Sequence, residues 1–385
     1  MISRRALIKS VAASALLPAT ALRAQTRVIT TPIAVEENRV WIAATIGGSQ
    51  PLQFIIDTGA VVSLLQERIA RALNLRERGR FRLVGAGGPE DFLLYEGRDV
   101  AFSSGMVQHS VVFGAMQPSL VLGRDAAGLL AAGLLTEADS DLDFGRGEWR
   151  LYPDGRGARE GYRELSSSIQ HVGGGAGSPY IFVDAFLDGN AFRFLLDTGM
   201  PGQVRLWPRA VRRSGLWNDT NSYAPVRAFG IGGAGARGRM VRGRMLRIGD
   251  FAFERPLVTL NDPASTHESF ADGIIGLPFI ELLNLSTDVR RHKLWAQPSG
   301  RPQRPEHYRL SGLWVDPHGN ELEIKDVGRG SPAAEAGLQR GDEIVGLTLP
   351  EFVRRADGPA GESFELRYRR GGETRTARLT LRAYL

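Results

Sequence analysis

Two Asp-Thr-Gly triplets are the residues of this sequence best suited to chemistry. One occupies residues 57–59 after the apolar run FII, and the other occupies residues 197–199 after the run FLL. A single triplet after a strand is typical of a polar turn, but two copies require another explanation. If Asp57 and Asp197 lie close together, both cannot ionise at low cost, so one carboxyl stays protonated and the pair titrates as a unit. The ionised member can take a proton from water while the protonated member polarises an amide carbonyl, which is chemistry suited to peptide hydrolysis.

The other residues of the triplets suit such a pair. Thr58 and Thr198 can hydrogen-bond across the interface between the two loops and fix them. Gly59 and Gly199 carry no Cβ, so backbone amides can approach the carboxylates. The triplets are therefore expected to hold the aspartates in place.

The segments around the triplets repeat each other in order. With an offset of 140 residues, VWIAATIGGSQPLQFIIDTG aligns with YIFVDAFLDGNAFRFLLDTG without a gap. After the triplets the offset becomes 145, which aligns GAGG with GIGG and later GLLAAGLL with GIIGLPFI. This ordered series indicates two homologous lobes, and a pseudo-twofold axis between them would bring the triplets face to face.

The elements that must position the triplets are mostly strands. Each repeat reads as a strand, a hairpin turn that contains glycine, and a second strand that leads into Asp-Thr-Gly. Short helices are expected near residues 66–73 and 279–283. Many short strands with Gly-rich turns predict a mostly β fold with two homologous barrel-like lobes, the first over residues 25–157 and the second over residues 158–300.

The triplet DTGA, a later Gly-rich stretch and the element GIIG resemble the retropepsin-like aspartic proteases. The double lobe in one chain resembles the exported bacterial members of that clan. The resemblance covers roughly residues 39–298. It implies an aspartic endopeptidase with Asp57 and Asp197 as the catalytic pair, supported by Thr58, Gly59, Thr198 and Gly199. Because one chain supplies both triplets, a monomer that acts on a peptide or protein substrate is expected.

By the same resemblance, two Gly-rich stretches are the tips of flap hairpins that close over a bound peptide. Gly-rich tips open readily and let a peptide backbone come near, although an ordinary flexible hairpin is the alternative. The expected flap residues are Gly85, Ala86, Gly87, Gly88, Gly230, Ile231, Gly232 and Gly233. The second stretch also contains a G-x-G-x-x-G pattern, but no helical pattern follows it, so no dinucleotide or other cofactor is expected.

Three departures from the family's pattern weigh against efficient catalysis, and two of them, Met200 and Pro201, favour a rival interpretation. Ala131 stands where the second repeat has glycine, and its methyl group can crowd the strand behind the catalytic loop. Met200 and Pro201 follow the second triplet, and Pro201 has no N–H to donate near Asp197. Val61 lacks a hydroxyl. The alternatives to a protease are therefore a duplicated β fold without catalysis and a non-catalytic exported adaptor that binds peptides in the same cleft.

The segment after residue 300 begins as a polar, Pro-rich linker and continues with a different pattern. Ser331 suits a helix N-cap, Pro332 the first helical position and Gly337 the end of this helix. With the signature GSPAAEAGLQRGDEI, residues 301–385 resemble a PDZ domain. The resemblance implies that a protein C-terminus adds as an extra strand and that a loop holds its carboxylate. That loop would consist of Ser311, Gly312, Leu313 and Trp314. A structural or autoinhibitory role is the alternative.

Residues 1–24 begin with basic residues, continue with an apolar run and end with small residues, and are expected to be an export signal. The string SRRALIK resembles the twin-arginine form, so a periplasmic or secreted protein is expected. A Sec signal with chance arginines, or a mere amphipathic start, is the alternative.

Charge and composition disfavour several other classes. The chain of 385 residues has a net charge of +6, but residues 1–24 hold four basic residues and no acid, which leaves +2. The remaining arginines are scattered, so no nucleic acid partner is expected. No later apolar run reaches the roughly 20 residues that a membrane span needs. Cysteine is absent and the six histidines stand apart, so no disulfide, thiol nucleophile or metal site is expected.

Overall fold

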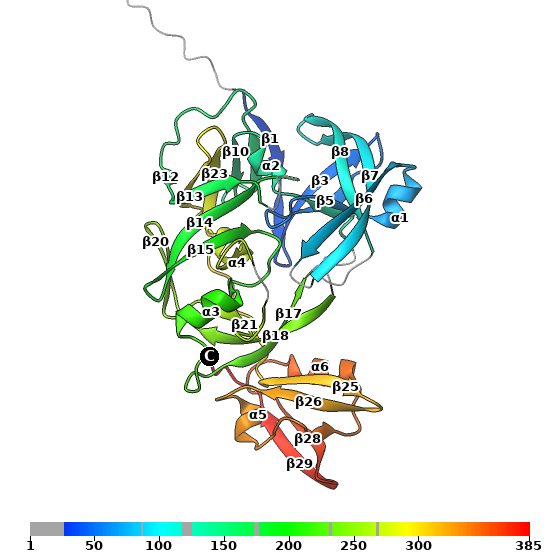
Figure 1. Ribbon diagram of the computed structural model, residues 1–385, viewed down its shortest axis with the longest axis vertical. Coiled ribbons are helices and arrows are strands. Elements are labelled where there is room, and N and C mark those ends of the chain that lie inside the picture. Colours follow the sequence, from blue (N-terminus) through cyan, green and yellow to red (C-terminus); the bar gives the residue numbers. More distant parts are fainter. Residues whose placement is uncertain (1–26, 86–87, 118–124, 173–176, 231–232, 267–268) are drawn as a thin grey trace, which may run out of the picture.

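The computed structural model describes residues 27–85, 88–117, 125–172, 177–230, 233–266 and 269–385. Within this part of the chain, four β-sheets and six short helices form two lobes and a smaller C-terminal domain. Figure 1 shows the lobes side by side and the C-terminal domain beneath the second lobe. The mostly β fold that the sequence predicts is confirmed.

The first lobe is built on an eight-stranded sheet. In spatial order its strands are β2 (Ala34–Glu36), β3 (Arg39–Ile46), β4 (Leu52–Ile56), β9 (Gly128–Leu130), β5 (Ser63–Gln66), β8 (Val107–Met116), β7 (Gly88–Phe102) and β6 (Arg76–Gly85). An additional pairing between β3 and β7 curls this sheet toward a barrel. Apolar side chains alternate along β3, which is buried at every second residue, so its inner face contributes to the core.

The second lobe repeats this plan in a ten-stranded sheet. In spatial order its strands are β17 (Ala224–Gly230), β18 (Gly233–Arg242), β21 (Leu257–Asn261), β16 (Val204–Leu206), β22 (Gly273–Gly276), β15 (Asn190–Asp197), β14 (Tyr180–Leu187), β19 (Met245–Ile248) and β20 (Phe251–Glu254), with β13 (Ser167–Gln170) paired to β14. One buried hydrophobic cluster runs through both lobes.

A third sheet joins the lobes, and the sequence repeat did not reveal it. Its strands are β1 (Ile29–Pro32), β11 (Glu148–Leu151), β10 (Ser140–Asp143), β23 (Leu283–Asp288), β24 (Lys293–Pro298) and β12 (Arg163–Glu164). At its centre β10 of the first repeat pairs with β23 of the second, with Leu142 opposite Leu285. The lobes are therefore connected by main-chain hydrogen bonds as well as by packing.

The register of the hairpins corrects the ungapped alignment of the two repeats. Trp41 lies opposite Ile55 in the first lobe, and Phe182 lies opposite Leu195 in the second. Ile55 and Leu195 each stand two residues before their aspartate, so Trp41 corresponds to Phe182 and not to Ile181. The alignment was wrong by one residue along the first strand, because the hairpin connection of the first lobe is one residue longer.

The helices are short and lie at the ends of strands. They are α1 (Glu67–Ala72), α2 (Gly133–Thr136), α3 (Pro208–Ser214), α4 (Leu277–Ile280), α5 (Pro332–Glu335) and α6 (Leu349–Ala356). The prediction for residues 66–73 is confirmed by α1. The helix expected at residues 279–283 begins earlier, because Pro278 is accommodated in the first turn of α4.

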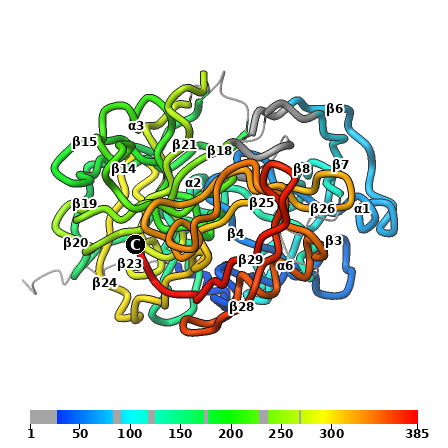
Figure 2. Tube along the Cα trace, turned by 90° about the horizontal axis from the view of Figure 1, so that it is seen from below, coloured from blue at the N-terminus to red at the C-terminus, as the bar shows by residue number. Residues whose placement is uncertain are grey.

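The C-terminal domain has its own sheet and its own core. The strand order is β25 (Leu313–His318), β26 (Glu321–Val327), β27 (Glu343–Ile344), β28 (Ser363–Arg370) and β29 (Glu373–Thr380). The side chain of Ser331 caps α5 by accepting from Ala334 N–H, and Gly337 follows the helix with φ +74°, as the sequence predicts. Figure 2 views the molecule from the end that carries this domain.

No helix within the described residues is both long enough and apolar enough to cross a membrane. The expected export signal at residues 1–24 lies outside the described residues.

Candidate active site

The two triplets lie at the ends of corresponding strands. Asp57 directly follows β4, which pairs in parallel with β9, and Asp197 ends β15, which pairs in parallel with β22. Both aspartates are partly exposed, and their carboxyl groups are close enough to share a hydrogen bond. The tertiary structure thus brings together the two carboxyls that are 140 residues apart in the sequence.

The two threonines of the triplets are hydrogen-bonded across the lobe interface. Thr58 N–H donates to Thr198 Oγ1 at 3.1 Å, and Thr198 N–H donates to Thr58 Oγ1 at 3.0 Å. Each hydroxyl then donates to a main-chain oxygen of the opposite lobe, Thr58 to Leu196 at 2.7 Å and Thr198 to Ile56 at 2.6 Å. Both threonines are fully buried, where an unpaired polar group is costly. These four bonds therefore fix how far apart the aspartate loops can be.

The two glycines of the triplets leave space for the carboxylates. A Cβ on Gly59 would overlap with the carboxyl group of Asp197, and a Cβ on Gly199 would lie 2.5 Å from the carboxyl carbon of Asp57. Each glycine thus makes room for the aspartate of the other lobe. At these two positions any larger residue would push the carboxyl groups apart.

The electrostatic surroundings of the pair disfavour its ionisation. Desolvation raises the pKa of Asp57 well above its usual range, and the neighbouring Asp197 carboxylate raises it further. Desolvation also raises the pKa of Asp197, while hydrogen bonds from Asp57 and from backbone N–H groups act in the opposite direction. The pair is consequently suited to hold one proton at weakly acidic pH.

The backbone after the second triplet supplies the donor that Pro201 lacks. Gly199 N–H and Met200 N–H both donate to Asp197 Oδ1, at 2.8 Å and 3.1 Å. Met200 is itself buried against Trp207 and Ile274. The expectation that a hydrogen bond near Asp197 is missing was wrong, because the preceding residue donates it.

Ala131 and Val61 are accommodated in the first lobe. Ala131 is buried, and its N–H donates to Ser63 Oγ at 3.0 Å. Gly276, its counterpart, donates instead to the Gln203 carbonyl at 2.9 Å. Val61 contributes through its main chain, since its carbonyl accepts from Ser178 N–H of the second repeat at 2.8 Å. The hydrogen bonds that hold the two loops therefore differ between the lobes where the residues differ.

Three residues near the pair were missed by the sequence reasoning. Arg39 begins β3 and Tyr180 begins β14, so the corrected register makes them counterparts in the two lobes. Two residues beyond the pairs Trp41–Ile55 and Phe182–Leu195, the same register places Arg39 opposite Asp57 and Tyr180 opposite Asp197. The third is Arg205 in β16, whose charge acts on Asp197. Desolvation and the charges of Asp57 and Asp197 raise the pKa of Tyr180 to about 12. A correct alignment of the first strands would have paired Arg39 with Tyr180.

The expected flap residues lie at the ends of two long hairpins. In the first lobe Gly85 pairs with Gly88 at the end of β6 and β7, and in the second Gly230 pairs with Gly233 at the end of β17 and β18. The remaining predicted tip residues lie outside the described part of the chain: Ala86, Gly87, Ile231 and Gly232.

The expected carboxylate loop of the C-terminal domain lies before β25, apart from the aspartate pair. Gly312 has φ +75°, a conformation that favours glycine, and its N–H donates to the Arg309 carbonyl at 3.3 Å. Leu313 N–H donates to Ser311 Oγ at 3.4 Å, and both of these residues are buried. Trp314 lies beside the Arg227 and Arg309 guanidinium groups. The N–H groups of Gly312 and Leu313 in the expected loop thus have partners within the domain.

A pocket of about 500 Å³ lies next to this loop at the end of α6. Its lining residues are Glu306, His307, Tyr308, Leu310, Ala356, Asp357, Gly358 and Pro359. None of the four predicted loop residues lines it.

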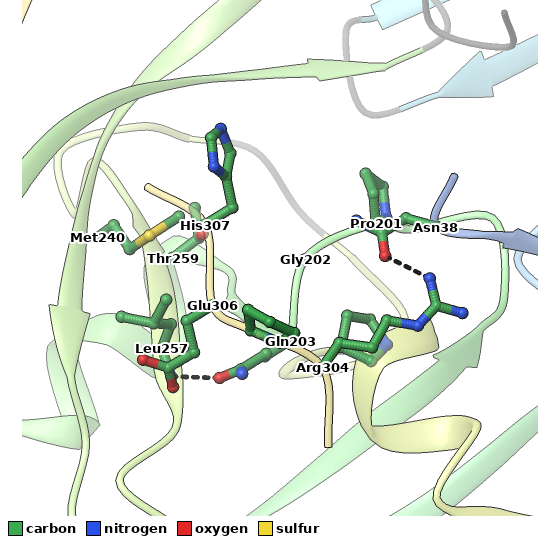
Figure 3. Close-up of a pocket in the computed structure, with 12 residues that line it drawn as sticks. Asn38, Pro201, Gly202, Gln203, Met240, Leu257, Thr259, Arg304, Glu306 and His307 are labelled. Carbon is green, nitrogen blue, oxygen red and sulfur yellow. Dashed lines mark hydrogen bonds between the residues drawn. The ribbon is translucent and has the colours of Figure 1, made fainter. Parts of the chain in front are cut away.

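A second pocket, of about 480 Å³, lies beside the segment that follows the second triplet. Figure 3 shows Pro201, Gly202 and Gln203 after the second triplet and Arg304, Glu306 and His307 of the linker among the residues that line it. Arg304 donates to Asn38 Oδ1 at 3.0 Å and to Glu281 Oε2 at 2.7 Å, which ties the linker to both lobes. Neither aspartate of the pair lines this pocket.

Within the described part of the chain, no group of three or more His, Asp or Glu side chains could hold a metal ion.

Comparison with known proteins supports this reading of the fold. The family model described as Aspartyl protease matches the chain twice, over residues 42–134 and over residues 183–279. Each match covers one triplet, so the two lobes have an aspartyl protease-like fold.

No curated protein matches the chain. Among solved structures, the chain is similar to Basic 7S globulin from soybean, with 10% sequence identity and a TM-score of 0.43. The match covers 71% of this chain and 95% of that chain. Likeness at this level carries no argument about function.

Proposed function

We propose that this protein is an aspartic endopeptidase that hydrolyses peptide bonds at the Asp57/Asp197 pair. The observation that carries this proposal is the pair itself, two partly exposed carboxyls in hydrogen-bonding contact and locked by the crosswise threonine bonds. A purely structural role would not require glycines that leave open the space around each carboxyl. The family match to both lobes agrees with a hydrolase.

The chemistry follows from one proton shared by two carboxyls. The ionised carboxylate takes a proton from a water molecule, whose oxygen attacks the scissile carbonyl carbon. The protonated carboxyl gives its proton to the carbonyl oxygen, which produces a gem-diol. One carboxyl then gives its proton to the amide nitrogen while the other carboxylate takes a proton from a gem-diol hydroxyl, so the C–N bond breaks and the pair regains its starting state. No charge needs to leave the site during this cycle.

The substrate class we propose is a peptide or an unfolded protein segment. The β6–β7 and β17–β18 hairpins offer main-chain groups to an extended chain, in the way that strands add to an exposed edge. One chain supplies both triplets, so we propose that the protein acts as a monomer. We also propose that residues 1–24 direct it to the periplasm or out of the cell.

The first test is hydrolysis of unfolded casein between about pH 4 and pH 7 by the protein and by its Asp57→Asn and Asp197→Asn variants. We expect cleavage that both substitutions reduce by at least about a thousandfold, because each removes one of the two acid–base groups. Circular dichroism of the variants is the control for folding. Cleavage that survives both substitutions, or no cleavage by the parent protein at any pH, would refute the proposal and favour a peptide-binding protein.

We further propose that residues 301–385 are a PDZ domain that gates the second flap hairpin. Tyr223, next to β17, donates its hydroxyl to Asp326 Oδ1 at 3.1 Å and to the Val327 carbonyl at 3.0 Å. Arg237 of β18 forms an ion pair with the same Asp326 at 3.3 Å. A Cβ on Gly328 would overlap with the Tyr223 carbonyl, so the two main chains touch.

The edge that a bound peptide would use lies next to this contact. β25 is an edge strand of the C-terminal sheet, and Arg227 of β17 forms an ion pair with its Asp316 at 3.2 Å. A peptide that adds to β25 would therefore meet the flap strand β17. In this proposal, occupancy of the domain moves the flap.

The gating proposal is tested by Tyr223→Phe, which removes one hydroxyl and keeps the ring. We expect a change in KM or kcat for casein peptides of about two- to tenfold, since a buried hydrogen bond contributes about 1 kcal/mol. Tyr152→Phe is the matched control, because the Tyr152 hydroxyl binds Asp141 away from the flap. Equal effects of the two variants would contradict gating.

A further inference from the structure

The two lobes differ at one position beside the aspartate pair. In the first lobe Leu64 of β5 lies opposite Leu129, and in the second Arg205 of β16 lies opposite Ile274. The next pairs, Leu65 with Gly128 and Leu206 with Gly273, show that β5 and β16 occupy the same place. Leu64 of the first lobe is therefore replaced by Arg205 in the second.

This position lies on the same face of each sheet as the aspartate. Across the neighbouring strands, Ile274 lies beside Leu195, which stands two residues before Asp197. Residues two apart on a strand point to the same face, so Arg205 shares its face with Asp197. By the same register, Leu64 shares its face with Asp57.

The surroundings on that face are apolar in both lobes. In the first, Leu64 packs in a cluster with Ile55, Phe92, Ala126 and Leu129. In the second, the corresponding cluster contains Trp207 and Ile274, and the Arg205 guanidinium lies 5.8 Å from the centre of the Trp207 ring. Arg205 Nε is buried and has no hydrogen-bond partner among the described residues. A cation in such surroundings is stabilised by the nearby Asp197 carboxylate.

The backbone reinforces this difference. Asp197 Oδ1 accepts two N–H donors, from Gly199 and Met200. Asp57 Oδ1 accepts from Gly59 N–H at 2.9 Å. Ala60 N–H and Met200 N–H each donate at 3.2 Å to the main-chain oxygen of their own aspartate, and of these two only Met200 N–H also donates to the carboxylate. Hydrogen bonds to a carboxylate favour its ionised form, so the one additional contact of Asp197, from Met200 N–H, acts in the same direction.

Of the other charged or titratable groups that face the pair, Arg39 opposes this bias. Its charge acts first on Asp57, which lies opposite it, and then on Asp197, while burial lowers the pKa of this guanidinium. Tyr180 stays neutral in the range where carboxyls titrate, because its pKa is raised to about 12. The charge of Arg205 acts on Asp197.

We propose that Asp197 carries the negative charge of the resting pair and Asp57 carries the proton, and that Arg205 is the positioning residue that sets this order. In the hydrolysis proposed above, on which this assignment of roles rests, Asp197 takes the proton from water and Asp57 gives its proton to the carbonyl oxygen. In the second half, Asp197 gives its proton to the leaving nitrogen and Asp57 takes one from the gem-diol. The pair then returns to its first state.

The order of ionisation can be measured without any substrate. The full protein is labelled with ¹³C at the aspartate carboxyl carbons, and the two resonances are assigned by their loss in Asp57→Asn and Asp197→Asn. A pH titration of the unsubstituted protein then follows both carboxyls. We expect the Asp197 carboxyl to ionise at lower pH than the Asp57 carboxyl. The reverse order, or two indistinguishable titrations, would overturn the proposal.

The role of Arg205 is tested by Arg205→Leu, which introduces the residue that the first lobe has at this place. We expect the ratio of the two ionisation constants to fall by about tenfold, the size expected for loss of one nearby charge. Arg205→Lys is the matched control, since it keeps the charge and should retain most of the ratio. An unchanged ratio in Arg205→Leu, or an equal fall in both variants, would overturn the role of Arg205.

These readouts separate this inference from the proposed function. If Arg205→Leu does not fold, the titration of the unsubstituted protein still decides the order of ionisation. If the casein assay fails while Asp197 ionises first, the proposed protease activity is refuted and the charge assignment stands. If casein is cleaved while Asp57 ionises first, the charge assignment is refuted and the proposed protease activity stands.

Discussion

The first and second lobes carry the same triplet on the same strand arrangement, yet the loops behind the two triplets are packed differently. Gly276 ends β22 in the second lobe, where a Cβ would overlap with the Gly202 carbonyl and lie 2.7 Å from the Met200 carbonyl. The first lobe has Ala131 at this place, and its methyl group is accommodated. The comparison indicates that the two lobes share the geometry of the aspartates, while the residues that pack around the aspartates differ between the lobes.

The largest effect is expected where the lobes are most alike. Gly59→Ala and Gly199→Ala each place a methyl group against the opposite aspartate and should reduce kcat/KM for casein peptides by at least about a hundredfold. A displacement of about 1 Å in a catalytic group can have an effect of that size. Gly202→Ala is the matched control, because its Cβ would meet Met200 Cε at an ordinary 3.5 Å. A strong effect in one lobe alone would break the symmetry inferred for the triplets.

A smaller effect should distinguish the lobes. We expect Gly276→Ala to lower the free energy of unfolding by about 1–3 kcal/mol, because the new methyl group meets two main-chain oxygens that cannot easily move. The reciprocal Ala131→Gly should lower it by roughly 0.5–1 kcal/mol through added chain entropy. Urea denaturation measures both. Equal effects would contradict the different packing of the two loops.

The smallest effect concerns the dependence of stability on pH. The folded-state pKa of Asp57 is raised above its unfolded value, so its contribution is fully present below the unfolded pKa and is lost as pH rises through the folded pKa. Asparagine does not titrate, so Asp57→Asn should gain stability relative to the unsubstituted protein as pH rises from about 4 to 7.

The same measurement on Asp197→Asn sharpens the comparison. This variant should gain less, because it leaves Asp57, which has fewer hydrogen bonds to support its charge. Thermal unfolding at several pH values gives both curves. A larger gain for Asp197→Asn would reverse the order of the two lobes.

Much of the fold was predictable because its signals are local. The repeated strand–hairpin–strand pattern before Asp57 and Asp197 depends on alternating apolar residues and turn glycines, which are close neighbours in the sequence. The helix caps at Ser331 and Gly337 are equally local. The match of both lobes to the aspartyl protease family agrees with the prediction from the triplets.

The alignment of the first strands failed because register depends on the length of a hairpin connection. One extra residue in the first lobe shifts every position of β3 relative to β14, and similar apolar residues hide the shift. Arg39 and Tyr180 were consequently not recognised as counterparts. The error about Pro201 had a different cause, since the Met200 N–H can reach Asp197 only in the folded loop.

The sequence by itself determined the duplication, the two triplets and the strand pattern that leads into each, because these rest on neighbouring residues and on repetition. Only the tertiary structure decided that β10 and β23 join the lobes in one sheet, that the C-terminal domain contacts the second flap hairpin, and that Arg205 shares a sheet face with Asp197 while Leu64 shares one with Asp57. These contacts join residues far apart in the chain, and their pairing depends on strand register and on packing between domains, which short-range patterns do not encode.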